Sequence, residues 1–163
     1  MKFSNAIKFA FPAAVIGILS CLAPTSAFAS TSVPTTFTVS ATVQATCVIS
    51  ATAMSFGTYT AVVANSTSTV SVTCTNTTPY TVALDAGLAT GATVTNRSMK
   101  GTGSALLGYT LYSDTGRSVN FATTASITGN GAAQPITIYG QIPANEYVAP
   151  GSYTDTITAT VTY

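Results

Sequence analysis

The chain has 163 residues, of which 47% are hydrophobic and only 6% are charged, and its formal net charge is +1. It contains no histidine and only four carboxylates, none of them in an evident local pair, so we expect no enzyme, no metal site and no cofactor. Because it also has few positive side chains, we expect no nucleic-acid partner. No segment after residue 29 is long and apolar enough to cross a bilayer, so we expect no membrane insertion.

Residues 1–29 have the pattern of a cleaved signal peptide. Two lysines and an apolar run at residues 9–22 precede a small-x-small cleavage site at residues 27–29. The apolar run is short for a membrane span and a good cleavage site follows it, so we expect export with cleavage and no anchor. The mature chain then begins at Ser30, and its three positive side chains against four carboxylates give a net charge of −1.

The first regular pattern of the mature chain lies at residues 37–47, within a strand-like run that extends to residue 50. Apolar or small residues occupy the odd positions, and Thr, Ser or Gln occupy the even ones. This alternation predicts a strand with one buried face. The strand is either the first strand of the chain's own sandwich, which the pattern alone favours, or a strand donated to a neighbouring subunit. Periodicity does not separate the two interpretations.

Cys47 and Cys74 are the two cysteines of the mature chain, because Cys21 leaves with the signal peptide. An even pair of cysteines in an exported protein predicts a disulfide. Two thiols without a histidine would make a poor metal site.

Further strand-like runs follow, and turn sequences rich in Gly, Asn, Asp and Pro separate them. The stronger runs are residues 69–74, 80–85, 106–113, 136–142 and 153–163, and the weaker ones are residues 54–59, 93–100 and 119–123. No window has a sustained helical period. Many short strands between turns predict an all-β sandwich or barrel in a single domain.

The last run brings a second alternating strand to the C-terminus. Apolar residues alternate with threonines at Tyr153, Ile157, Ala159, Val161 and Tyr163, and Asp155 alone interrupts the apolar face. The ends of an open sandwich are often edge strands, and a free edge is a template for another chain.

Five blocks of the mature chain contain a more specific pattern. In order they are FTVSATVQATCVISATAMSFGTY, VSVTCTNTTPYTVALDAG, LGYTLYSDTGRSVNF, ITIYGQIPA and PGSYTDTITATVTY. They resemble the spore coat protein U domain family, which includes the pilin subunits of archaic, Csu-like chaperone–usher pili. The chain departs from the family pattern after Arg117, where an aromatic residue, often Trp, is expected. This chain has Val119-Asn120-Phe121 there, and Phe121 takes the aromatic role.

The resemblance implies an incomplete immunoglobulin-like β-sandwich that is completed by donor-strand exchange. Residues 30–45 would be the donor-strand extension and residues 46–163 the sandwich domain. A periplasmic chaperone would first lend the missing strand, and the extension of the next subunit would replace it at an outer-membrane usher. The implied donor face is Phe37, Val39, Ala41 and Val43. The implied groove-lining, chaperone-facing residues are Tyr153, Ile157, Ala159, Val161 and Tyr163, with the Tyr163 carboxylate as an anchor.

The predicted function is therefore that of a structural subunit, of the shaft type, in a surface fimbria that supports adhesion and biofilm formation. The protein would pass through the periplasm to the cell surface, and its neighbours would be copies of itself. The alternative is a self-contained secreted coat or matrix protein that does not polymerise. A third class, a carbohydrate-binding module, is disfavoured by the absence of Trp.

Overall fold

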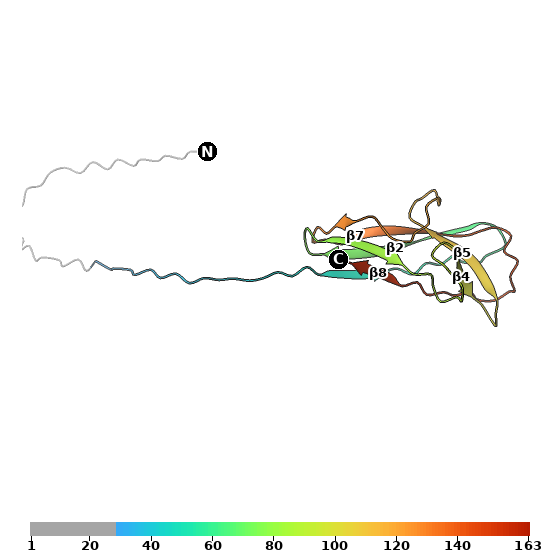
Figure 1. Cartoon of the computed structure of the whole chain (residues 1–163), viewed down its shortest axis with the longest axis horizontal. Helices are drawn as coiled ribbons and strands as arrows, with labels where there is room; N and C mark the ends of the chain where they lie inside the picture. The colour runs from blue at the N-terminus through green and yellow to red at the C-terminus, as the bar shows by residue number, and fades with distance from the viewer. Residues whose placement is uncertain (1–28) are drawn as a thin grey trace, which may run out of the picture. The chain divides into compact units, whose positions relative to one another are not determined.

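The computed structural model describes residues 29–163, so the predicted signal peptide lies outside the described residues except for its last one. The chain divides into two units between Ser40 and Ala41. In the first unit, residues 29–40 form no helix or strand and are exposed. The second unit, residues 41–163, contains every strand of the described chain (Figure 1).

The second unit is built of short strands, and the described residues contain no helix. The strands are β1 (Cys47–Ala51), β2 (Ala64–Cys74), β3 (Pro79–Leu84), β4 (Arg97–Lys100), β5 (Leu106–Tyr112), β6 (Ile127–Thr128), β7 (Gln134–Ile142) and β8 (Ala159–Thr162). β-branched threonine and valine residues suit the pleated surface of such strands.

The strands form two antiparallel sheets. The larger sheet has the order β1-β2-β7-β5-β4, and the smaller sheet has the order β6-β3-β8. The register of the larger sheet is fixed by a long ladder between β2 and β7, in which Ala64 lies opposite Ile142 and Val72 opposite Gln134. In the smaller sheet β8 pairs with β3, with Ala159 opposite Leu84.

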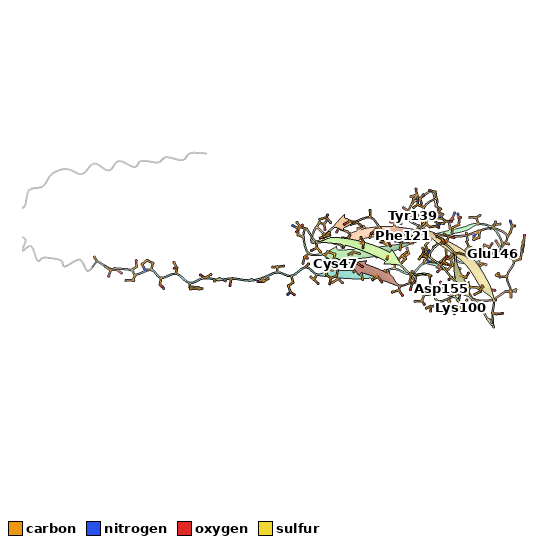
Figure 2. The ribbon with its side chains drawn as sticks, viewed as in Figure 1. Cys47, Lys100, Phe121, Tyr139, Glu146 and Asp155 are labelled. Carbon is orange, nitrogen blue, oxygen red and sulfur yellow. A yellow bond between two sulfur atoms is a disulfide. The ribbon has the colours of Figure 1, made fainter. Side chains whose placement is uncertain are left out.

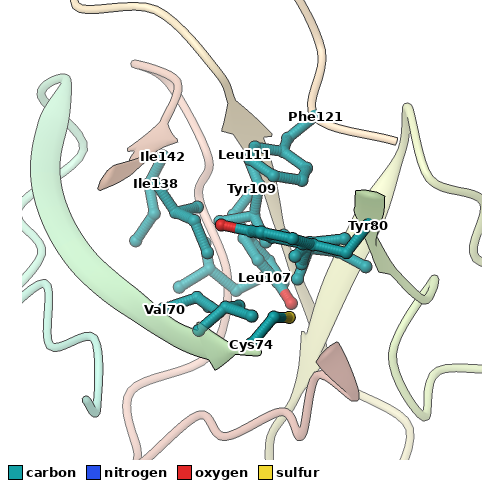
Figure 3. Close-up of a cluster of buried hydrophobic side chains, with 12 residues drawn as sticks. Val70, Cys74, Tyr80, Leu107, Tyr109, Leu111, Phe121, Ile138 and Ile142 are labelled. Atoms are coloured by element: carbon teal, nitrogen blue, oxygen red, sulfur yellow. The ribbon is translucent and has the colours of Figure 1, made fainter. Parts of the chain in front are cut away.

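One hydrophobic core lies between the two sheets, and Figure 3 shows its side chains pointing toward one another. The larger sheet contributes apolar residues at every second position of β2, β5 and β7, and the smaller sheet contributes those of β3. Phe121, the aromatic residue after the Arg117 block, is also buried in this core. Its members are Val70, Val72, Cys74, Tyr80, Val82, Leu84, Leu107, Tyr109, Leu111, Phe121, Ile138 and Ile142.

The predicted internal runs at residues 69–74, 80–85, 106–113 and 136–142 correspond to β2, β3, β5 and β7, and the weak run at residues 93–100 contains β4. The weak runs at residues 54–59 and 119–123 are not strands. Residues in the second of these make only isolated bridges, Tyr112 with Asn120 and Ala83 with Thr123. Alternation alone does not make a strand, because the backbone also needs a continuous hydrogen-bonded partner.

Candidate functional site

The sandwich has two free strand edges on the same side. β1 stands at one end of the larger sheet and pairs only with β2, and β8 stands at one end of the smaller sheet and pairs only with β3. β1 and β8 lie against each other (Figure 1), yet no ladder joins them within residues 29–163. The outer backbone groups of both strands are therefore available to another strand.

A groove opens next to these edges, where the chain continues after β1 and before it enters β8, and it is bounded by residues 51–61 on one side and residues 146–159 on the other. Its first part is a cavity of about 400 Å³, and core residues such as Val70, Leu111 and Ile138 form its floor. Its second part is a cavity of about 810 Å³ that reaches Leu107 and Ile142. Met54, Phe56, Met99 and Tyr153 line both parts, so the cavities form one groove along the open side of the core.

The C-terminal segment forms one wall of this groove with the alternation seen in the sequence. Tyr153, Asp155, Ile157, Ala159 and Val161 are half-buried, and the threonines between them are exposed. Of the apolar residues singled out in the sequence, Tyr153, Ile157 and Ala159 line the first cavity, and Val161 packs against the core. Tyr163 follows the end of β8 and is 57% exposed.

Before it becomes β8, this segment is held by separate backbone and side-chain hydrogen bonds and not by a continuous ladder. Thr154 bridges to Lys100 at the end of β4, and the two residues exchange backbone hydrogen bonds. The Asp85 backbone N–H donates to the Thr158 carbonyl at 3.1 Å, and the Asp85 carboxylate accepts from the Thr158 N–H at 3.0 Å. The segment thus starts beside the larger sheet and ends in the smaller one.

The electrostatic environment of Asp85 favours its charged form. Burial by itself raises the pKa of this carboxyl, but hydrogen bonds from Thr158 and Gly87 and the positive charge of Arg97 outweigh burial. The resulting pKa is lower than that of an ordinary aspartate.

Arg97 is completely buried next to this point. Its guanidinium donates to the carbonyls of Asp85 at 2.9 Å, Val94 at 2.5 Å and Phe121 at 3.3 Å. Burial lowers the pKa of Arg97, and the nearby Tyr109, Asp85 and Asp155 partly oppose that effect. The side chain therefore ties the ends of β3 and β4 to the loop at Phe121.

Asp155 places a carboxylate on the C-terminal wall of the groove. It accepts a 2.6 Å hydrogen bond from the Tyr109 hydroxyl and a 2.8 Å hydrogen bond from the Leu88 N–H. Burial, and then the contact with Asp155, raise the pKa of Tyr109 well above its ordinary value. In the sequence, Asp155 stands out only as an interruption of an apolar face. A carboxylate on such a face predicts a buried donor opposite it, but the sequence does not identify that donor.

The predicted disulfide is present and joins the start of β1 to the end of β2. Cys47 and Cys74 lie directly opposite each other in the ladder, and their sulfur atoms are 2.01 Å apart. Cys47 therefore fixes the point at which residues 41–46 lead into the sandwich (Figure 2).

The side chains of the predicted donor face are exposed to solvent. Phe37, Val39 and Val43 are 86%, 82% and 84% exposed, and Ala41 is also exposed. None of them lies in a strand. The described chain therefore has an open apolar groove and, separately, an uncovered apolar stripe with the period of a strand.

Other kinds of site find little support in residues 29–163. No group of three or more His, Cys, Asp or Glu side chains there is placed to hold a metal ion. The same residues contain no helix that is long and apolar enough to cross a membrane.

Comparison with known proteins identifies the family of this fold. The family model for the Spore Coat Protein U domain matches residues 33–160. The chain belongs to this family. One relative is Protein U of Myxococcus xanthus, which is 35% identical over 127 residues that cover 68% of this chain and 71% of Protein U.

A solved structure extends the comparison to the fold of this Spore Coat Protein U domain. It is the crystal structure of the CsuC–CsuE chaperone–tip adhesion subunit pre-assembly complex, from the archaic chaperone–usher Csu pili of Acinetobacter baumannii. The TM-score is 0.56 and the sequence identity 25%, over 75% of this chain and 41% of the matched chain. The chain thus spans about two fifths of that neighbour's length. The predicted all-β, immunoglobulin-like class is confirmed.

Proposed function

We propose that this protein is a structural subunit, of the shaft type, of a surface fimbria in which residues 30–45 of one copy fill the groove of the next. Phe37, Val39, Ala41 and Val43 would face the core of the neighbour. Their backbone would pair with the free edges of β1 and β8. The observation behind the proposal is the open groove itself, which lies beside two strands, β1 and β8, that each have one unpaired edge.

The size and chemistry of the groove fit an apolar strand. Its walls contain half-buried apolar side chains such as Met54, Phe56 and Ile157, which another apolar face would cover. Burying Phe and Val side chains contributes roughly 1–3 kcal/mol each, and each main-chain hydrogen bond adds about 1 kcal/mol. The acceptor also gains, because the inserted strand closes its own core. A strand held in this way leaves slowly, since its departure reopens that core.

The family and the solved neighbour support a proposed route of assembly. A fold whose groove is open needs temporary cover before polymerisation, and we assign that role to a periplasmic chaperone that contacts the C-terminal segment and the Tyr163 carboxylate. An outer-membrane usher would then exchange the chaperone's strand for the N-terminal segment of the next copy. The neighbour's origin in a chaperone–subunit complex supports this route. The assembled fimbria would act in adhesion and biofilm formation.

The test uses the mature chain, residues 30–163, and changes one face of the N-terminal segment at a time. Val39→Asn with Val43→Asn places amides on the proposed donor face. Thr38→Asn with Ser40→Asn places the same amides on the opposite face and is the matched control. We expect the natural chain and the control to form oligomers that survive SDS without heating, whereas the Val39/Val43 variant stays monomeric in gel filtration.

The second candidate, a self-contained coat or matrix protein, is favoured by one observation. The chain covers 71% of Protein U but only 41% of the Csu complex chain. On this candidate all three forms would be monomers, and a peptide of residues 35–45 would leave their melting temperatures unchanged. That result would replace the fimbrial proposal.

A further inference from the structure

Three glycines lie directly beneath side chains that line the groove. Gly140 in β7 lies below Met54 and Phe56, Gly101 lies below the ring of Tyr153, and Gly87 lies below the carboxylate of Asp155. Each of these four side chains lines at least one part of the groove. Several side chains in the walls of the groove therefore pack against glycines, which have no Cβ atom.

The Gly140 position shows the effect most clearly. Gly140 lies between the buried Ile138 and Ile142 on β7 and is itself buried. A Cβ atom there would be 2.8 Å from the Phe56 ring and closer still to the Met54 sulfur. Both side chains would have to move away from β7, and because both line the groove, we expect this movement to narrow it. The absence of a side chain at Gly140 thus allows Met54 and Phe56 to pack directly against the backbone of β7.

Gly101 has the same relation to Tyr153. A Cβ atom at Gly101 would be 2.6 Å from the ring, whose hydroxyl is held by a 2.7 Å hydrogen bond to the Ala149 carbonyl. The ring is also fixed at its base, because the next residue, Thr154, pairs with Lys100. Displacement by a new methyl group would therefore tilt the ring into the groove.

We propose that Gly140 and Gly101 set the depth of the groove, and so determine that it accepts a strand with bulky apolar side chains. This inference rests on the proposed function and adds the positions that select the incoming strand. Neither glycine has a positive φ, so alanine at these sites changes the available space and not the allowed backbone. Gly87 has a φ of +81°, so a substitution there would also strain the backbone and is a poorer test.

The experiment measures binding of a fluorescent peptide of residues 35–45 to the full mature chain. The chain bears Val39→Asn and Val43→Asn, so its own N-terminal segment does not compete. We expect Gly140→Ala and Gly101→Ala each to weaken peptide binding about tenfold, the order of an overpacking penalty. Gly108→Ala in β5 is the matched control, because its Cβ would meet only Glu146 atoms at 3.6 Å or more, and its binding should not change.

A rescue variant separates groove depth from general damage. Gly140→Ala combined with Met54→Ala removes a side chain that the new methyl group displaces, and we expect it to regain most of the lost affinity. Circular dichroism checks that each variant is folded. If Gly140→Ala does not fold, peptide binding by Gly101→Ala tests the inference alone. Equal binding by the glycine variants and the Gly108→Ala control would overturn the inference but leave the proposed function standing. No peptide binding by the parent chain would overturn both.

Discussion

The contact between Tyr109 and Asp155 places a polar pair in a largely apolar groove. Tyr109 is a buried residue, and its hydroxyl donates to a carboxylate on the C-terminal segment, so the pair connects the centre of β5 to the groove wall. A buried donor without its acceptor costs about 1–3 kcal/mol, and a charged acceptor raises the value of the bond. Tyr109 thus fixes the position of Asp155.

This pair predicts a loss of stability at alkaline pH. The pKa of Tyr109 is raised by burial and by Asp155, so the folded state keeps a proton that the unfolded chain releases. The contribution is complete below about pH 10, the ordinary tyrosine pKa, and is lost as the pH rises beyond it. Urea unfolding between pH 8 and pH 11 should show this fall in the natural chain and a shallower fall in Tyr109→Phe. Equal slopes would contradict the assignment.

The role of Tyr109 was not available from the sequence. Alternation along residues 106–113 places Tyr109 and Tyr112 on opposite faces, but it does not say which hydroxyl meets a carboxylate 46 residues further along the chain. The glycines below the groove were equally hidden, because their meaning depends on the side chain above them. By contrast, the disulfide between Cys47 and Cys74 followed from the composition and the predicted export.

Among the structural elements, the C-terminal segment is the one whose attachment is least regular. Before β8 begins at Ala159, it has the bridge of Thr154 to Lys100, the hydrogen bonds of the Asp155 carboxylate and those at Thr158, but no continuous ladder. The Asp85 carboxylate supplies one of these, and its low pKa shows that the folded state prefers its charged form. The charged form of Asp85 therefore contributes to holding this wall of the groove in place.

We predict that acid loosens this wall. Because the pKa of Asp85 is lowered in the folded state, its contribution is present above about pH 4, the ordinary aspartate pKa, and is lost as the pH falls through the lowered value. The difference in melting temperature between pH 7 and pH 3 should be smaller for Asp85→Asn than for the natural chain. An unchanged difference would show that other carboxylates govern the acid response.

Sequence patterns predicted the internal strands of the sandwich better than the strands at the two ends of the chain. β2, β3, β5 and β7 have partners on both edges, so alternation and pairing agree. The runs at the two ends are regular strands only over Cys47–Ala51 and Ala159–Thr162, because the rest of each run lacks a continuous ladder. β6 has two residues, too few for a periodic pattern.

For the molecule as a whole, the disulfide is the covalent link between an edge strand and the body of the larger sheet. It closes a loop with a sequence separation of 27, and such a loop contributes about 3–4 kcal/mol in the chain-entropy model. We expect Cys47→Ala with Cys74→Ala to lower the free energy of unfolding by an amount of this order. Urea unfolding of the variant beside the oxidised natural chain measures it, and a difference below about 1 kcal/mol would argue against that model.

The position of this link has a mechanical consequence for a filament of the proposed kind. Tension along such a filament would enter each subunit at Thr46 and act first on Cys47, the terminal residue of the ladder between β1 and β2. A ladder pulled from its last pair opens one pair at a time, at low force. The disulfide bond to Cys74 would transmit the force directly to β2. The long ladder between β2 and β7 would then bear a force that acts parallel to its strands. The subunit would resist in shear where it would otherwise unzip.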